Sequence, residues 1–409
     1  MFEIIDKDPN PTVIKVIGVG GAGGNAVEHM IREGVQGVEF ICANTDAQSL
    51  KNSSAGIKLQ LGPGLGAGGK PERARDLAQT ERERIAEALQ GAHMAFITAG
   101  MGGGTGTGAA PVVAEVAREL GILTVAVVTK PFEFEGKRMR LAEEGLGELA
   151  QHVDSLIVIL NEKLMEVLGD DVSMTEAFKS ADNVLKNAVG GIAEIINVPG
   201  LVNVDFEDVR TVMGEMGKAM MGSATAAGAE RARAASEKAV ASPLLEGIEL
   251  SGARGVLVNI TASKDLGMKE VREVMTTIRN YASPEATIIF GTVFDEGMED
   301  QLRVTVVATG LGGAVRMAAK PKLQPVQPEA YRRTGTDDMP VDAMGSMAQS
   351  NMELGMPQVF HGRGARGPAT GSGMADSMRS AGSDPSDIPA VLRSGGDIPI
   401  PAFLRRQAD

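Results

Sequence analysis

The sequence predicts an α/β fold over residues 12–317, and three observations support this prediction. Apolar segments of strand length alternate with segments of helical periodicity, which is the pattern of a sheet covered by helices. Residues 174–196 carry apolar side chains at steps of three and four, which predicts one long helix with a buried face. Glycine-rich turns stand between strands and helices, as they do in Rossmann-like domains.

The segments before the long helix should form one sheet with helices packed on it. We expect strands at 12–19, 37–44, 94–99, 122–129 and 156–160, and helices at 25–33, 72–89 and 109–120. On the long helix, the expected core stripe runs from Phe178 to Ile195. The segments after it should form a smaller α/β sandwich, with helices at 209–221, 230–241 and 268–281 and strands at 255–261, 287–294 and 303–309.

The chain changes character after Met317. Residues 318–386 are rich in Gly, Pro, Ser, Met and Ala and cannot bury enough apolar area to offset the entropy of ordering. The motif at 387–393 is echoed at 397–406, and a repeated apolar-basic motif on a tether is typical of a docking peptide. We therefore predict a flexible arm (1–11), a Rossmann-like domain (12–173), a core helix (174–199), a smaller C-terminal domain (200–317), a disordered linker (318–386) and a docking peptide (387–409).

The composition limits the classes of partner. The net charge of −13 argues against nucleic-acid binding, which requires a basic surface to displace counterions. The single cysteine, Cys42, cannot form an internal disulfide and fits a reducing, cytoplasmic setting. No apolar stretch approaches the ~20 residues of a membrane helix, and the first residues show no signal-peptide pattern.

The first glycine turn, at residues 18–23, has the spacing G-x-G-x-x-G between a strand and a helix. Glycines there allow backbone N–H groups to approach a phosphate, and the helix N-terminus adds a favourable dipole. Asp46, at the end of the second strand, stands where a dinucleotide enzyme would hold a ribose. Taken alone, this turn favours a nicotinamide-dependent oxidoreductase, and that alternative stays open at this point.

A second glycine loop, at residues 64–70, matches G-x-x-x-x-G-K but is followed by Pro71. A P-loop requires Ser or Thr at that position as a magnesium ligand, so the P-loop interpretation fails. We expect instead a flexible loop beside the phosphates.

The third loop, GGGTGTG at residues 102–108, carries the strongest signal. Five glycines in seven residues can present consecutive N–H donors in a concave nest that suits di- and triphosphate oxygens. Two threonines, Thr105 and Thr107, add hydroxyl donors. A tight connection without a ligand would need only one or two glycines.

An acidic loop, NVDFED at residues 203–208, follows the long helix. Asp205 and Asp208 are candidates to orient or activate water, although either could simply cap the next helix. The loop is distant from the nest along the chain, and nothing in the sequence places it against its own chain's ligand.

Together these motifs resemble the tubulin/FtsZ family of GTPases. The resemblance rests on residues 18–27, 44–46, 64–69, 102–108, 130–138, 181–185 and 203–208, covers about residues 12–317, and extends to the terminal peptide. It implies a self-assembling cytoplasmic GTPase of bacterial cell division, concentrated in a ring at mid-cell, with no membrane span of its own. It implies GTP or GDP as ligand, with Mg²⁺ held mainly by the phosphates and without a protein metal site.

The resemblance also implies residue roles. Phosphates and nearby groups of the nucleotide would be held by Gly20, Gly21, Ala22, Gly23, Gly24, Asn25, Gly103, Gly104, Thr105, Gly106, Thr107 and Gly108. Glu135 and Arg138, with Arg140 as the rival, would contact the ribose end, and Asp182 would accept from the guanine N–H groups. Asn203, Asp205 and Asp208 would enter the neighbouring subunit's site. Membrane-anchoring and regulatory proteins would bind the terminal peptide.

The spacing from Glu135 to the next arginine is one residue shorter than in the family, and two further residues depart from its usual pattern. Lys70 stands near the phosphates and Glu207 adds a third acid to the loop. A scaffold that binds nucleotide without hydrolysing it stays open as a further alternative.

Overall fold

A computed structural model of the chain describes residues 12–169, 172–198, 200, 202, 204–215, 217–242, 245 and 252–311. The predicted arm at 1–11, the linker at 318–386 and the docking peptide at 387–409 lie outside the described residues. The domain boundaries given above therefore stay predictions.

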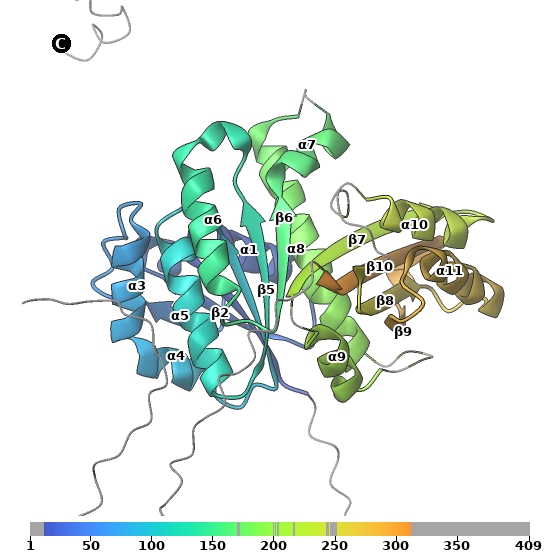
Figure 1. Cartoon of the computed structure of the whole chain (residues 1–409), viewed down its shortest axis with the longest axis horizontal. Coiled ribbons are helices and arrows are strands. Elements are labelled where there is room, and N and C mark those ends of the chain that lie inside the picture. Colours follow the sequence, from blue (N-terminus) through green and yellow to red (C-terminus); the bar gives the residue numbers. More distant parts are fainter. Residues whose placement is uncertain are drawn as a thin grey trace, which may run out of the picture. The chain divides into compact units, whose positions relative to one another are not determined.

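The first lobe is built on six parallel strands in the order β3-β2-β1-β4-β5-β6 (Figure 1). The strands are β1 (Ile14–Val19), β2 (Glu39–Asn44), β3 (Ile57–Gln60), β4 (Met94–Gly100), β5 (Leu123–Lys130) and β6 (Ser155–Leu160). This order places a topological switch point between β1 and β4, where the chain leaves the two strands toward opposite faces of the sheet. The structure confirms the predicted α/β fold.

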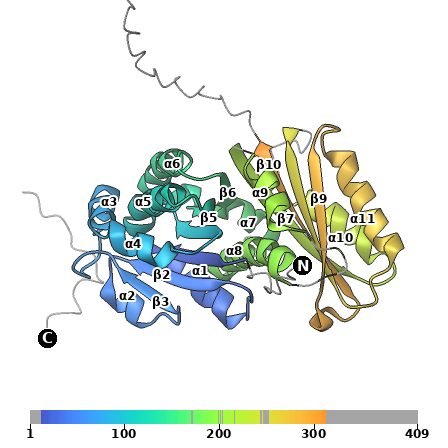
Figure 2. The ribbon, with the colours of Figure 1, turned by 90° about the horizontal axis from the view of Figure 1, so that it is seen from below.

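Helices cover both faces of this sheet, as Figure 2 shows. Side chains alternate along each strand: Val16 packs in the cluster shared with α1 and α8, and Ile17 packs in the cluster shared with α4, α5 and α6. The helices of this lobe are α1 (Gly20–Arg32), α2 (Ala47–Lys51), α3 (Pro71–Thr80), α4 (Arg82–Leu89), α5 (Thr105–Glu119), α6 (Lys137–Leu149) and α7 (Asn161–Leu168).

The long helix α8 (Met174–Asn197) joins the first lobe to the second. It starts with a capping box, in which Ser173 and Glu176 satisfy each other's backbone N–H groups. The residues Leu185, Val189 and Ile192 are buried in the core that α8 shares with β1 and β4. The predicted core helix is thus present with nearly the expected bounds.

The second lobe continues the sheet through β7, in the order β7-β10-β8-β9. Its elements are α9 (Phe206–Met213), β7 (Gly217–Ala227), α10 (Arg231–Val240), β8 (Gly255–Ala262), α11 (Met268–Tyr281), β9 (Thr287–Phe294) and β10 (Gln301–Leu311). Helices α10 and α11 pack on one face of these strands, and α8 and α9 contact the other (Figure 2).

Several predicted elements were wrong in their bounds. Segment 72–89 forms two helices that break at Glu81, and α1 and α5 begin inside the glycine loops rather than after them. The helix expected at 209–221 stops at Met213, and β7 replaces its second half. Gly214 ends the helix, and β7 gains a long partner in β10, to which residues 220–227 pair continuously and Lys218 pairs after a shift in register. That pairing partner lies far away in the sequence, so local periodicity did not indicate it.

Candidate functional site

The candidate site lies at the carboxyl ends of β1 and β4, at the switch point of the sheet. The loops after these strands touch: Gly20 has φ +76°, and a Cβ at this position would lie 2.9 Å from the backbone nitrogen of Gly106. Both the conformation and the contact therefore require glycine. Ligands of open α/β sheets bind in the crevice at this point of the fold.

The N-termini of α1 and α5 point their free N–H groups into the same region. Neither helix has a side-chain cap or an acidic residue in its first turn. Unsatisfied N–H groups and the positive ends of two helix dipoles attract an anion. Two converging helix N-termini fit a polyphosphate.

Hydrogen bonds hold the nest in shape. The Gly102 N–H donates to the Thr107 hydroxyl over 2.8 Å, and Thr107 is 2% exposed. The hydroxyls of Thr45 and Thr105 are 2.7 Å apart, which ties the loop after β2 to the nest. The Thr107 hydroxyl thus accepts a hydrogen bond within the loop, and its contact with a phosphate stays a prediction.

A hollow of about 320 Å³ opens in front of the nest. We call it the nest hollow, and its lining includes Gly21, Ala22, Gly103, Gly104, Thr105, Gly106, Asn161, Phe178, Glu135 and Arg138. A Cβ at Gly21 or Gly103 would meet no heavy atom within 4 Å, so these backbones face open space. The glycine surface is accessible to a ligand.

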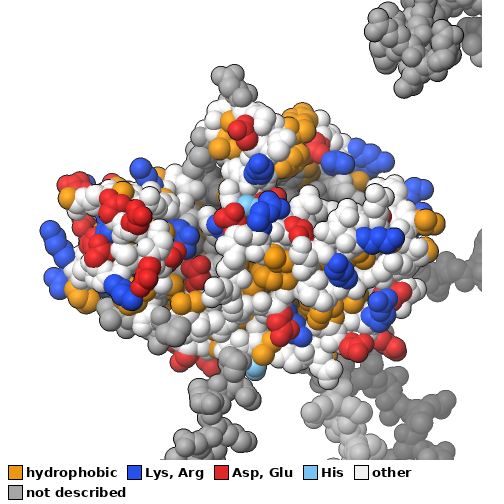
Figure 3. All heavy atoms as spheres, turned by 180° about the vertical axis from the view of Figure 1, so that it is seen from behind, with side chains coloured by type: hydrophobic (Ala, Val, Ile, Leu, Met, Phe, Trp, Pro, Cys, Tyr) orange, Lys and Arg blue, Asp and Glu red, His pale blue; other side chains and the backbone are white. Residues whose placement is uncertain are grey.

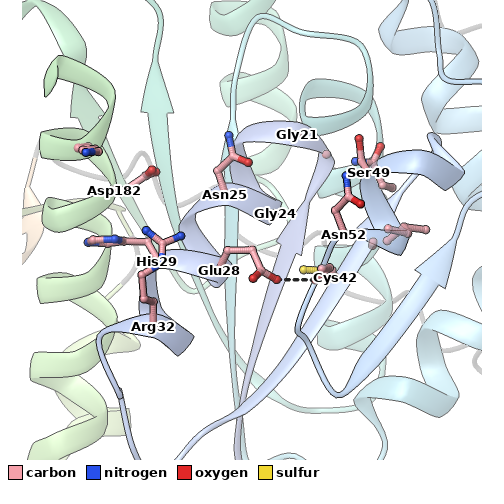
Figure 4. A pocket seen from close by; sticks show the side chains of 16 residues that line it. Gly21, Gly24, Asn25, Glu28, His29, Arg32, Cys42, Ser49, Asn52 and Asp182 are labelled. Atoms are coloured by element: carbon pink, nitrogen blue, oxygen red, sulfur yellow. Dashed lines mark hydrogen bonds between the residues drawn. The ribbon is translucent and has the colours of Figure 1, made fainter. Parts of the chain in front are cut away.

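A second hollow of about 490 Å³ shares Gly21 with the first. Its lining includes Gly20, Gly24 and Asn25 of α1 together with Asp182 of α8. Figure 4 shows Asp182 on α8 across from the α1 side chains Asn25 and His29. Burial raises the pKa of Asp182 to about 6, and the nearby His29 and Arg32 oppose this rise. The carboxylate is a half-buried acceptor that lines this hollow.

Glu135 and Arg138 form an ion pair of 2.7 Å at the rim of the nest hollow. The rival Arg140 pairs with Glu144 at 3.7 Å and does not line this hollow. The positions of the two arginines favour Arg138 as the residue that contacts a ligand in the nest hollow.

Two lining residues escaped the sequence analysis. Phe178 was placed in the core stripe of the long helix, but this was wrong: the side chain is 46% exposed and lines the nest hollow. It lies one turn before Asp182 on the same face of α8, with Phe132 in edge contact at 6.1 Å. Asn161 is 5% exposed, and its Oδ1 has no hydrogen-bond partner in the described part of the chain. Its position after β6, at the carboxyl edge of the sheet, was the signal that could have indicated it.

Two of the glycines predicted to bind phosphate lie where backbone segments pack closely together. A Cβ at Gly23 would lie 2.4 Å from the Thr98 carbonyl oxygen, and one at Gly108 would lie 2.0 Å from the Pro71 carbonyl oxygen. Close packing of α1 on β4 and of α5 on α3 therefore depends on these glycines. The loop at 64–70 lies beside the nest, because a Cβ at Gly104 would be 3.1 Å from the Lys70 nitrogen.

Asp46 is engaged in local structure. Its carboxylate caps α2 by accepting from the Gln48 N–H (2.9 Å) and from the Ser49 hydroxyl (3.0 Å). Capping of α2 thus accounts for Asp46 without a ribose ligand, and the residue gives the oxidoreductase alternative no specific support.

The acidic loop lies at the opposite edge of the sheet. Asp205 and Asp208 are exposed, and Asp205 caps α9 by accepting from the Asp208 N–H over 2.8 Å. Phe206, between them, is in ring contact with His93, which directly precedes β4. The nest follows the other end of this strand, so about 23 Å, at ~3.3 Å for each of seven residues, separates the two ends. Asn203 lies outside the described residues.

Figure 1 shows the same separation, with α7 and α9 at opposite ends of α8. The nest of one chain and its own acidic loop are therefore not brought together. Across the described residues, no group of three or more His, Cys, Asp or Glu side chains is arranged to hold a metal, and no described helix is long and apolar enough to cross a membrane.

Comparison with known proteins identifies the fold and its family. The model "Tubulin/FtsZ family, GTPase domain" matches residues 13–169, and "FtsZ family, C-terminal domain" matches residues 217–312. A Pseudomonas putida protein named Cell division protein FtsZ is 53% identical over 414 residues, which cover 100% of both chains. The relative of that name from Coxiella burnetii is 58% identical over 332 residues, covering 80% of this chain and 86% of its own.

A solved structure, "FtsZ dimer, empty (M. jannaschii)", is 45% identical with a TM-score of 0.71, covering 75% of this chain and 89% of that one. These matches agree with the switch-point nest and the second lobe described above. The chain belongs to the tubulin/FtsZ family of GTPases, among its FtsZ members.

Proposed function

We propose that this protein is a GTP-driven filament protein of bacterial cell division, in which each GTP is hydrolysed at the junction of two subunits. The observation that carries the proposal is the distance between the nest and the acidic loop within one chain. A site that needs both must take them from different molecules. A head-to-tail arrangement, with the α9 end of one subunit on the nest of the next, supplies both.

In this proposal the nest and the two helix N-termini bind the triphosphate. Glu135 and Arg138 lie at the rim, where a ribose would stand. Asp182 accepts from the N1 and N2 hydrogens of guanine, which an adenine does not offer in the same arrangement. The Oδ1 of Asn161, which has no partner among the described residues, accepts a further N–H, and the ring of Phe178 offers a stacking surface.

The exposed carboxylates Asp205 and Asp208 then orient water against the γ-phosphate of the neighbour's nucleotide. Asn203 belongs to the same loop and takes part in the proposal. Loss of the γ-phosphate changes the charge at the junction. The rate of GTP hydrolysis therefore sets how long the contact between two subunits lasts.

Large exposed apolar side chains at the nucleotide end support a subunit contact there. Leu65, in the glycine loop beside the nest, is 83% exposed, and Phe134, next to Glu135, is 74% exposed. Apolar side chains exposed around a polar site are typical of a surface covered by a partner. Such short-range contacts must also overcome the repulsion between chains of net charge −13.

Mg²⁺ would be bound by the phosphates. The described residues offer no cluster of three or more carboxylate, His or Cys side chains for it. In the cell, we propose that the filament lies in the cytoplasm at the division ring, and that membrane anchors and regulators bind the peptide at 387–409. The basic side chains on the face in Figure 3 lie among acidic ones, which does not favour nucleic acid as a partner.

A mixing experiment tests the shared site. Asp208→Ala should bind GTP normally but lose most turnover, and Asp182→Ala should lose GTP affinity but keep its acidic loop. Neither variant alone should hydrolyse GTP efficiently. Their mixture should recover turnover, measured as phosphate release, at junctions between a GTP-bearing subunit and an intact acidic loop.

Glu207→Ala is the matched control, because the carboxylate of Glu207 lies 3.6 Å from Arg210 within its own helix and its loss should leave most turnover. Co-sedimentation must show that the two variants enter the same filaments. Co-assembly without recovered turnover would falsify the shared site, and full activity of Asp208→Ala would remove the acidic loop from the reaction.

A further inference from the structure

The acidic loop is braced by a residue at the far end of the strand that leads to the nest. His93 precedes β4, and its ring stands edge-on to Phe206 with centroids 6.1 Å apart and planes at 65°. This is a favourable geometry for two aromatic rings. Phe206 lies in the sequence between Asp205 and Asp208, so a group that fixes its ring also fixes the first turn of α9.

His93 is itself held firmly. Its N–H donates to the Val13 carbonyl (2.9 Å), its Nδ1 accepts from the Val13 N–H (3.0 Å), and its carbonyl accepts from the Leu123 N–H (3.1 Å). These bonds attach the residue to the ends of β1 and β5, and the Nδ1 bond fixes the plane of the ring. The ends of β1 and β5 therefore hold the exposed side chain of His93 in one orientation.

Phe206 is held from a second direction. The Arg210 guanidinium lies 4.9 Å from the centre of its ring, and the ring packs on the buried core. Arg210 belongs to α9 and moves with the loop, whereas His93 belongs to the first lobe. Of these two partners, only the histidine ties the loop to the GTPase domain.

We infer that His93 is a positioning residue for GTP hydrolysis, and that it acts on the nucleotide of the neighbouring subunit. The inference rests on the proposed function, because the loop that His93 braces serves the next molecule. His93 touches no reacting atom. It holds the carboxylates of Asp205 and Asp208 in place through Phe206.

Three substitutions separate the ring contact from the hydrogen bond. His93→Ala removes both, His93→Phe keeps the ring, and His93→Asn keeps a side-chain acceptor without the ring. We expect phosphate release per pelleted subunit to fall about 2- to 10-fold in His93→Ala and His93→Asn, as one aromatic contact predicts, and to stay near the parent value in His93→Phe. GTP affinity should not change, and Tm should fall by no more than a few degrees, because a single aromatic contact is lost. The inference would be wrong if His93→Asn kept more turnover than His93→Phe. It would also be wrong if only the mass of polymer fell and phosphate release per pelleted subunit did not.

The mixture of Asp208→Ala and Asp182→Ala reveals in which direction His93 acts. We expect the recovered turnover to fall when His93→Ala is added to the Asp182→Ala partner, which supplies the acidic loop. It should be kept when the same change is added to the Asp208→Ala partner, which supplies the GTP. Equal loss in both placements, or loss in neither, contradicts the inference. If the parent mixture co-assembles without recovery, the proposed shared site itself fails, and His93 then has no such role.

Discussion

Asp182 is the proposed guanine-recognition group, and the fold raises its pKa toward neutrality. Burial beside α1 raises its pKa to about 6, whereas a free aspartate would be ionised well below that pH. Guanine presents two N–H donors, so it binds the ionised carboxylate and not the protonated one. In this proposed role, nucleotide binding and proton release at Asp182 are linked.

We expect GTP affinity to be constant above about pH 7 and to fall below pH 6, approaching tenfold per pH unit as the carboxyl becomes protonated. Equilibrium binding of a fluorescent GTP analogue between pH 5 and pH 8 measures this. Asp182→Asn is the matched control, because it cannot titrate at this position. A slope common to both proteins belongs to the nucleotide phosphates, and identical profiles would exclude Asp182 as the linked group.

Helices α10 and α11 show how single elements of the second lobe are joined. Arg231 of α10 is 5% exposed and pairs with Glu270 of α11 at 2.7 Å and with Asp265 at 3.2 Å. Hydrogen bonding to Arg231 holds the pKa of Glu270 below its usual range, and Glu270 also accepts from the Gly267 N–H at the start of α11. One carboxylate thus serves as both ion-pair partner and helix cap.

Glu270→Ala should destabilise the fold by about 2 kcal/mol, less than the 3–5 kcal/mol of a fully buried pair because Asp265 remains beside Arg231. Urea unfolding followed by circular dichroism measures this free energy. Glu237→Ala breaks the exposed pair of Arg233 and Glu237 on α10 and should have little effect. Equal losses of unfolding free energy in the two variants would show that burial of Arg231 does not strengthen its ion pair.

At the scale of the whole molecule, the nest and the acidic loop lie at opposite ends of the first lobe. This arrangement predicts how activity depends on protein concentration. The glycine loops occupy the carboxyl edge of the first sheet and the acidic loop lies at its amino edge. In the proposed function a single chain carries half of each of two sites. Activity then belongs to the contact between chains rather than to the chain.

Specific activity should therefore be near zero at high dilution and rise above a threshold protein concentration. Phosphate release across a protein titration, in parallel with pelleting in GTP and in GDP, measures this. Turnover strictly proportional to protein at every concentration would mean that one chain holds a complete site.

The sequence by itself determined the parts of the site that depend on local backbone chemistry. Glycines between a strand and a helix fix a nest wherever the chain folds as an α/β sheet, so the loop at 102–108 and the turn at Gly20 followed from residue types and order. The acidic loop was likewise recognisable, and Asp205 caps α9 as its residue type allowed. A resemblance to a known family supplied the assignment of Asp182, which spacing alone does not give.

The tertiary structure decided which face of each helix or strand is buried and which element packs against it. Phe178 satisfies the periodicity of a core stripe, yet no element covers it in the described structure and it lines the nest hollow instead. Segment 217–227 became a strand because β10, distant in sequence, pairs with it. The distance between the nest and the acidic loop depends on strand direction and lobe packing. Such contacts join residues far apart in the chain, and local sequence carries no information about which distant surface will be the partner.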